Sequence, residues 1–295
     1  MNLLTKLFRK RTNKSSVRKR KNQPDVVDFS KENDLMNWAI EKARLTLHYF
    51  EASLENPKPN QHYFSIKVKI EDGNNTEHIW LIEPSFDQEG NLFGIVGNEP
   101  IDVTNIKYDQ KIGIDRELIS DWMIVEQGRL IGGYTIRAIR DTLESHQLLD
   151  FDKSLGHLIV DEGEDHFMPN GDTPEGAILA LEAAYNQDNL ENALDYKDFK
   201  AEASLMLNKL ENIPKTQDII KQTAETLKLS YIAALRKEGM PKFNHVQRAF
   251  PKRERIDDNH IIITEVCTYP DHGKSVQRLM TYKSENGWKV LSIVD

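Results

Sequence analysis

The sequence contains one cysteine, Cys267, in 295 residues. A single cysteine excludes an internal disulfide framework and is typical of proteins in a reducing compartment, so we expect a cytoplasmic protein. Cys267 ends a run that begins at Ile261 and has the composition of a strand. We therefore expect a buried, inert thiol at this position rather than a nucleophile.

Long apolar runs are also lacking. No stretch of about 18 apolar residues is present, so we expect no membrane-spanning helix. Four of the first eight residues are apolar, but Lys6 and Arg9 interrupt the run, so we expect no secretory signal. Residues 1–21 leave two interpretations open: weak contact with an anionic membrane surface, or a disordered, solvated tail, which the composition favours.

Acidic residues are absent from the first 24 positions, which hold nine lysines and arginines. The rest of the chain has 30 basic and 47 acidic residues, a net charge of −17, against −8 for the whole chain. Such an acidic body excludes general binding of nucleic acid, which needs a basic face. It favours a basic protein partner, because complementary charge speeds association.

Three kinds of reaction motif are missing: a glycine-rich phosphate loop, a zinc-type spacing of cysteine and histidine, and a nucleophile elbow. We therefore predict no cofactor and no metal site. The acidic segment of residues 161–166 lacks the ligand spacing of a calcium loop. A solvated acidic linker is the simpler interpretation of this segment.

Residues 33–145 have the pattern of an α+β domain that follows a basic, disordered tail over residues 1–32. Apolar residues recur every three or four positions from Leu35 to Leu54, which predicts an amphipathic helix that ends before Pro57. The period then changes to two, and turn residues separate the runs. These runs predict an antiparallel meander with strands at residues 64–70, 78–82, 92–97, 122–125 and 129–137.

A linker over residues 146–172 is expected to lead to a second α+β domain over residues 173–295. Thr173 and Pro174 mark a helix start. Helices are expected over residues 174–185, 190–210 and 216–237, and strands over 246–255, 260–269, 276–283 and 288–294. Three helices followed by a four-stranded antiparallel meander predict a curved, cone-like sheet around a helix, which can enclose a pocket.

The segment of residues 119–140 holds the first candidate binding residues. Asp121 and Trp122 lie at the start of a predicted strand, where they form either a carboxylate beside an aromatic platform for a ligand, or a turn cap beside a core tryptophan. The second interpretation is favoured, because buried tryptophan dominates small cores.

A double glycine, Gly132-Gly133, indicates a bulge or a close approach of the backbone to another group. If that group is a ligand, Tyr134 and Arg137 are the candidate contacts. On a regular strand these two side chains point to opposite faces, so they meet at one site only where the strand is kinked.

The second domain offers Asp195 and Asp198, which lie three positions apart on one face of a predicted helix. With Tyr196, His245 and His260 they are the candidates for a general acid or base inside the cone. The alternative for the two aspartates, a capping or solvent-facing role, is favoured, because neither has an assured partner in the sequence.

Two family resemblances can be named. Residues 33–140 resemble the YegJ-like family, a bacterial domain of unknown function, which implies a fold and no catalytic residues. The segments that carry it are the opening helix and residues 77–80, 94–100, 120–123 and 132–135. Residues 173–295 resemble the nuclear transport factor 2-like superfamily in the order of their elements, helped by residues 173–177 and 286–291. That resemblance implies a cone but no single function, since its members include enzymes and proteins described as toxin immunity proteins.

The sequence therefore predicts two α+β domains in a non-enzymatic cytoplasmic binding protein. An immunity-like protein that neutralises a basic toxin is the specific version. The alternative is an enzyme or small-ligand carrier that uses the cone of the second domain.

Overall fold

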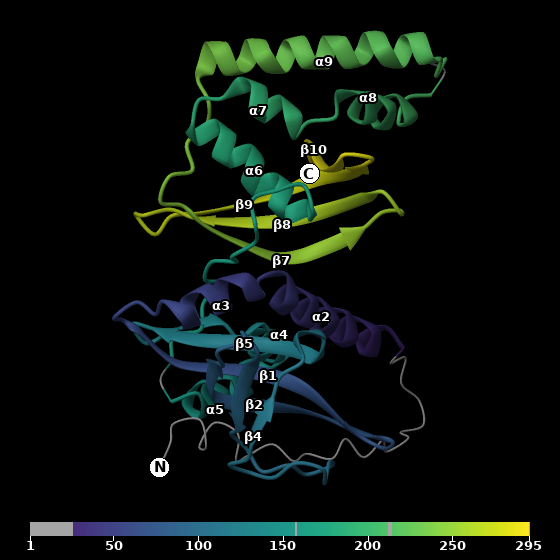
Figure 1. Cartoon of the computed structure of the whole chain (residues 1–295). Helices are drawn as coiled ribbons and strands as arrows, with labels where there is room; N and C mark the ends of the chain where they lie inside the picture. Colours follow the sequence, from purple (N-terminus) through teal and green to yellow (C-terminus); the bar gives the residue numbers. More distant parts are fainter. Residues whose placement is uncertain (1–25, 157, 212–213, 295) are drawn as a thin grey trace. The chain divides into compact units, whose positions relative to one another are not determined.

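The computed structural model describes residues 26–156, 158–211 and 214–294, and it shows two compact units (Figure 1). The units are Met1–Gly163 and Glu164–Asp295. Each contains helices and one antiparallel sheet, which confirms the predicted α+β class. The proposed membrane contact through residues 1–21 lies outside the described residues. Among the helices of the described ranges, none combines the length and the apolar character that crossing a membrane requires.

The N-terminal helical segment differs from the prediction at its start and in its middle, whereas its end at Glu55 agrees with the predicted stop before Pro57. Helix α2 (Val26–Leu45) begins inside the segment predicted as a tail over residues 1–32, and helix α3 (Leu47–Glu55) follows it after Thr46. The Thr46 hydroxyl is buried and donates a hydrogen bond of 2.7 Å to the carbonyl oxygen of Lys42. Such back-bonding bends helices, so the single predicted helix is two consecutive ones.

The first sheet has six strands in the order β4-β3-β2-β1-β5-β6, and every neighbouring pair is antiparallel. The strands are β1 (Gln61–Asp72), β2 (Asn75–Phe86), β3 (Leu92–Val96), β4 (Lys111–Gly113), β5 (Ile119–Glu126) and β6 (Arg129–Gly132). A short 3-10 helix, η1 (Arg116–Leu118), precedes β5. The meander predicted from the period of two is confirmed, and β4 is an additional strand.

Strand β5 forms the centre of this unit, because both of its faces are buried. Trp122 has no exposed surface, and the rings of Tyr49, Phe50 and Tyr134 surround it at centroid distances between 5.7 and 6.0 Å. Met123 points to the opposite face, into a second apolar cluster. Burial of each such side chain stabilises the fold by roughly 1.5–3 kcal/mol.

Helix α4 (Tyr134–Asp141) replaces the second half of the strand predicted over residues 129–137. The strand prediction is wrong there because Gly132 and Gly133 have φ angles of +68° and +61°, which favour glycine and turn the chain out of the sheet. Tyr134 and Arg137 are therefore three positions apart on a helix and not on opposite faces of a strand.

The linker predicted over residues 146–172 is structured in its first part. Helix α5 (Ser145–Ser154) occupies it, and Leu155 is buried in the cluster that contains Trp80 and Met123. The backbone of Ile159 then bonds with that of Leu130. The polar residues that suggested a linker face solvent. The apolar residues of the same segment pack against the second face of the sheet.

Replacing Gly132 with alanine is expected to lower the free energy of unfolding by about 3 kcal/mol, because two costs add. The left-handed backbone costs an alanine roughly 1–2 kcal/mol. The added Cβ would also lie 2.5 Å from the carbonyl oxygen of the buried Trp122, so the packing must shift. Urea unfolding followed by tryptophan fluorescence measures the loss.

Gly128→Ala is the matched control, because Gly128 has a φ of +77° and no atom within 4 Å of an added Cβ. It is expected to cost about 1 kcal/mol. Equal losses in the two variants would show that the contact with Trp122 does not matter.

The second unit places four helices before a four-stranded sheet, as the colours of Figure 1 show. The helices are α6 (Pro174–Asn186), α7 (Leu190–Asp195), α8 (Phe199–Asn208) and α9 (Gln217–Glu238). The strands are β7 (Gln247–Arg255), β8 (His260–Thr268), β9 (Lys274–Ser284) and β10 (Gly287–Val294), in the order β10-β9-β8-β7. The helices and the meander predicted for the second domain are confirmed, except that the helix predicted over residues 190–210 is divided by the cap of α8.

Candidate functional site

Asp121 is fully buried and holds the start of helix α4. One carboxylate oxygen accepts hydrogen bonds from the amides of Trp122 (2.9 Å) and Tyr134 (3.0 Å). The other accepts from the amide (2.8 Å) and the hydroxyl (2.6 Å) of Thr135. The first amides of a helix have no partner within the helix, so a carboxylate at this position caps it.

Lys67 is the cross-strand neighbour of Asp121 on β1. Its ammonium group lies 5.6 Å from the centre of the Trp80 ring and donates a hydrogen bond of 3.4 Å to the Thr135 hydroxyl. Burial lowers the pKa of Lys67, and the charge of Asp121 opposes that shift. Burial raises the pKa of Asp121, against the hydrogen bonds from Thr135 and the charge of Lys67. Burial thus shifts the pKa of each group towards its neutral form, and the charge of the other group opposes that shift.

The four candidate residues of the first unit come together, but inside the protein. The Trp122 indole donates to the carbonyl oxygen of Ala43 (3.0 Å), and the Tyr134 ring meets it edge-on. Arg137 donates to the carbonyl oxygen of Gly132 (2.9 Å), and Trp122 and Tyr134 are 0% and 3% exposed. This is the geometry of the favoured interpretation, a core tryptophan beside a capping aspartate.

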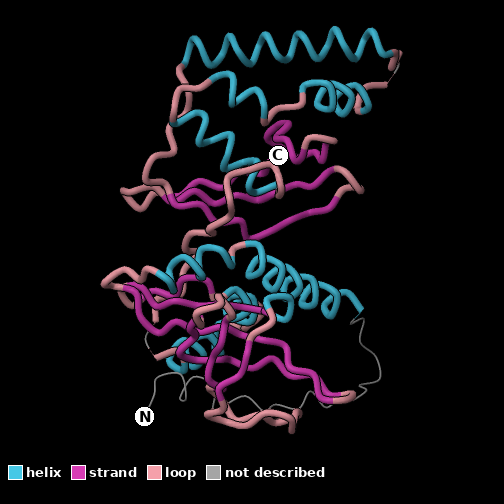
Figure 2. Tube along the Cα trace, viewed as in Figure 1, coloured by secondary structure: helices cyan, strands magenta, loops and turns pink. Residues whose placement is uncertain are grey.

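Figure 2 colours loops pink, and one of them, residues 97–110, connects β3 to β4. Side-chain hydrogen bonds tie this loop to the β1–β2 hairpin. One oxygen of Glu77 accepts from the amides of Ile101 and Asp102, both at 2.9 Å. Asp72 accepts from the amide and the hydroxyl of Thr104, both at 2.7 Å. The Asn98 side chain in turn accepts from the amide of Trp80 at 3.1 Å. The loop is therefore held in one conformation.

The same loop presents apolar side chains to solvent. Ile101 is 60% exposed and Tyr108 is 45% exposed. Glu99, Asp102 and Asp109 are exposed beside them in the sequence. We call these five residues the acidic loop surface. It belongs to the more acidic part of the chain, since residues 25–163 hold 13 basic and 26 acidic residues, whereas residues 164–295 hold 17 and 21.

In the second unit, Asp195 and Asp198 do not converge on a site. Asp198 caps helix α8, where its side chain accepts from the amide of Ala201 at 2.9 Å. Asp195 is exposed at the end of α7, and its carbonyl oxygen accepts from Lys289. His260 contacts Asp257 in the turn before β8 at 2.9 Å, and His245 is exposed.

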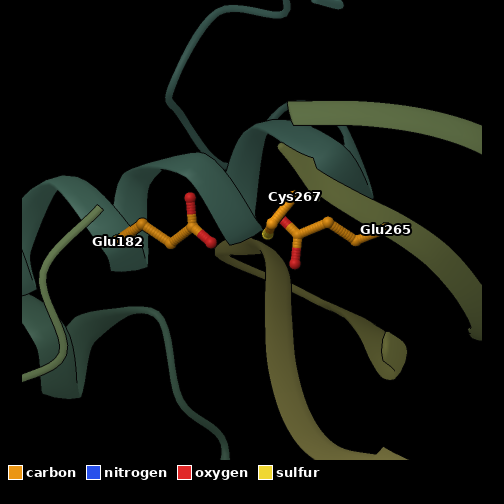
Figure 3. A group of neighbouring side chains, drawn as sticks. All are labelled: Glu182, Glu265 and Cys267. Atoms are coloured by element: carbon orange, nitrogen blue, oxygen red, sulfur yellow. The ribbon is translucent and has the colours of Figure 1, made fainter. Parts of the chain in front are cut away.

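A different group of polar side chains is buried between helix α6 and the sheet (Figure 3). Glu182 from α6 and Glu265 and Cys267 from β8 are 3%, 0% and 1% exposed. Figure 3 shows the two carboxyl groups directed towards one another, with the Cys267 sulfur beside them. Arg248 from β7 lies 3.1 Å from Glu182, and the Gln277 amide donates to Glu265. We call Glu182, Glu265 and Cys267 the buried triad.

The surroundings of the buried triad raise the pKa of all three side chains and so favour their protonated forms. Burial raises the pKa of Glu182, and the nearby charge of Glu265 raises it further. Burial also raises the pKa of Glu265, although the bond from Gln277 opposes the shift. Burial and the two carboxylates raise the pKa of the Cys267 thiol to about 12. The thiol is therefore protonated at neutral pH and is not a nucleophile in this environment.

Sequence reasoning missed Glu182 and Glu265, although each breaks a local pattern. Glu182 lies one turn after Ile178 in the apolar stripe of α6. Glu265 alternates with Ile263 and Cys267 on one face of β8. An isolated acid on a buried face is the signal that would have indicated them.

Two comparisons with known proteins match the first unit of the chain. The model of a family described as an uncharacterised protein conserved in bacteria, DUF2314, matches residues 33–158. The uncharacterised protein YegJ of Escherichia coli is 35% identical over 111 residues, which cover 38% of this chain and 71% of that protein. The chain belongs to the DUF2314 family. Its DUF2314 segment ends at residue 158, which places helix α5 within the domain.

Two further proteins are similar to parts of the chain. A protein of Neisseria meningitidis serogroup B that is named as an ankyrin repeat protein is 30% identical over 183 residues, covering 57% of this chain and 66% of that protein. A crystal structure titled as an NTF2-like transpeptidase of Campylobacter jejuni matches 41% of this chain and 99% of that chain, at 11% identity and a TM-score of 0.26. The second unit has the order that the sequence predicted for it, with helices before strands.

The segments that carry the DUF2314 resemblance are those that build this geometry. Residues 77–80 and 94–100 supply Glu77 and Asn98, which hold the loop of residues 97–110. Residues 120–123 and 132–135 supply the cap of helix α4. Glu77, Asn98 and Asp121 thus bond to the backbone of their own domain.

Proposed function

We propose that this chain is a non-enzymatic binding protein that recognises a basic protein partner through the acidic loop surface. One observation carries the proposal: a loop fixed by Glu77 and Asp72 leaves Ile101 and Tyr108 exposed to solvent. Exposed apolar side chains on an ordered loop are typical of interaction sites.

The order of the loop favours binding. A surface that is already held in one conformation does not lose loop entropy when it binds, so more of the contact energy remains as affinity. Ile101 and Tyr108 are flanked in the sequence by exposed charged residues, and interfaces likewise combine apolar and aromatic side chains with polar ones.

The charge supports a basic partner. The part of the first unit that holds the loop, residues 25–163, carries twice as many acidic as basic residues, 26 against 13. Its field speeds the approach of a basic protein and repels nucleic acid. The specific version of the proposal is an immunity-like protein that neutralises a basic toxin by covering its functional surface. The single cysteine supports a cytoplasmic setting for this encounter.

The alternative, an enzyme or ligand carrier that uses the second unit, is favoured by one observation, the buried carboxyl pair Glu182–Glu265. A carboxyl group with a raised pKa is a general acid only where a substrate reaches it. Both side chains are almost fully buried, at 3% and 0% exposure, so the pair is closed to substrate in this structure. The exposed loop therefore supports binding better than the buried pair supports catalysis.

Replacing Ile101 with aspartate is expected to weaken partner binding by about 30-fold or more, the effect of losing a central apolar contact. The partner is first captured by crosslinking the full chain in its native cell. It is then purified and its affinity is measured by titration calorimetry against the wild type and the variant. We expect a basic partner in a one-to-one complex whose affinity falls as salt is raised.

Leu149→Asp is the matched control, because Leu149 is also an exposed apolar residue of the first unit, at 67% exposure, but lies on helix α5. It is expected to bind like the wild type. A native-cell experiment that captures no stoichiometric partner, or a partner that both variants bind equally well, would reject the proposal.

A further inference from the structure

The buried triad has the ligand types and the spacing of a metal site. Glu182, Glu265 and Cys267 each offer one ligand atom, and these atoms lie within 4.8 Å of one another. Within the described ranges, this is the one group of three or more such residues that meets this distance. Metal–oxygen and metal–sulfur bonds of about 2.0–2.3 Å place ligand atoms at most about 4.6 Å apart, so small side-chain movements close the set around an ion.

The hydrogen bonding of the two carboxyl groups points to a missing partner. Both oxygens of Glu182 and Oε1 of Glu265 are buried without a hydrogen-bond donor. Arg248 contacts Glu182 at 3.1 Å as an ion pair without the geometry of a hydrogen bond. Buried polar atoms in proteins nearly always have a partner, so three such oxygens in one place indicate that something binds between them.

We propose that Glu182, Glu265 and Cys267 bind a Zn²⁺ ion that links helix α6 to strand β8. Two carboxylates and a thiolate suit Zn²⁺, whereas Mg²⁺ and Ca²⁺ take oxygen ligands. Binding of the ion releases the protons that the triad holds without metal, and the three ionised ligands then carry three negative charges, which Zn²⁺ and Arg248 neutralise together. A fourth position is left for water or a further ligand.

Two neighbours support the ligands from outside. Gln277 donates to the second oxygen of Glu265, and Arg248 lies against the second oxygen of Glu182. Partners of this kind orient carboxylate ligands and leave the other oxygen for the metal. Arg248 is fixed in turn, because it donates to the carbonyl oxygen of Phe243 at 3.0 Å.

The test uses the full chain, stripped of metal with a chelator, and two probes. Titration calorimetry with Zn²⁺ is expected to show one ion per chain. Addition of Co²⁺ is expected to give the thiolate-to-cobalt charge-transfer band in the near ultraviolet, which identifies the sulfur as a ligand. Cys267→Ser, which keeps the size of the side chain, should abolish the band.

Glu265→Gln is expected to weaken Zn²⁺ binding by more than about 100-fold, beyond the effect of losing an outer partner of a metal ligand. Asp271→Asn is the control, because Asp271 is an exposed carboxylate in the turn before β9. It should bind Zn²⁺ like the wild type.

The wild-type chain alone can overturn the proposal. A proton shared between Glu182 and Glu265 would satisfy the same oxygens and give the same neutral group with Arg248. In that case Zn²⁺ does not bind and Co²⁺ gives no charge-transfer band, whether or not any variant folds. Zn²⁺ binding that survives in Cys267→Ser with unchanged affinity would also reject the site, because the ion would then lie elsewhere.

Discussion

Replacing Asp121 with alanine is expected to lower the free energy of unfolding by about 3–5 kcal/mol, because it leaves several buried donors without an acceptor at about 1–3 kcal/mol each. The carboxylate accepts four hydrogen bonds, and three of them come from Tyr134 and Thr135 at the start of α4. Without it, these donors lose their acceptor, and Lys67 loses the nearby carboxylate charge that opposes the lowering of its pKa. Urea unfolding followed by tryptophan fluorescence measures the loss.

Glu99→Ala serves as the control, because Glu99 is an exposed acid of the same unit. Its effect on stability is expected to stay within about 0.5 kcal/mol. Asp121→Asn should fall between the two, since an amide has one acceptor oxygen in place of two. A loss below about 1 kcal/mol in Asp121→Ala would mean that the cap is not what holds α4.

The strands of both units were predictable because their signal is local. Phe64, Ile66 and Val68 alternate with polar residues, and that period of two is a direct consequence of strand geometry. Helix α4 was not predictable in the same way. Its start depends on Gly132 and Gly133 taking positive φ angles, and a glycine pair fits a bulge in a strand equally well.

The candidate site was less predictable, because it depends on contacts between distant parts of the chain. Glu77 reads as an ordinary strand residue until its carboxylate meets the amides of Ile101 and Asp102. Glu182 and Glu265 belong to a helix and a strand that only the fold brings together. Sequence reasoning found Asp121 and Trp122, since they stand out locally, but their burial had to come from the structure.

The second large effect is expected at Arg253 on strand β7. Its guanidinium donates two hydrogen bonds, of 2.6 and 2.7 Å, to the two oxygens of Glu175 on helix α6. Glu175 has no exposed surface, so removing the arginine leaves a buried carboxylate without its cation. Arg253→Met is therefore expected to lower the free energy of unfolding of the second unit by about 3–5 kcal/mol.

The Arg253–Glu175 pair also predicts that a second substitution restores the stability lost in Arg253→Met. If the loss in Arg253→Met comes from the uncompensated charge of Glu175, then Glu175→Met in the same chain should restore most of the stability. Buried ion pairs are often replaced by apolar side chains without loss, or with a gain of about 1–4 kcal/mol. A double variant as unstable as the single one would show instead that the shape of the arginine, and not the charge, matters.

A second arginine on the same strand, Arg255, allows the effect of burial to be distinguished from the effect of contact distance. Arg255 lies 2.6 Å from Asp258, as close as Arg253 lies to Glu175, but these two side chains are 70% and 92% exposed. Water screens an exposed pair, so Arg255→Met is expected to cost at most about 1 kcal/mol in urea unfolding. Since the shortest contacts of the two pairs have equal lengths, a several-fold difference between the variants measures what burial and the second hydrogen bond of Arg253 contribute together. Equal losses would mean that both arginines act through their packing on β7.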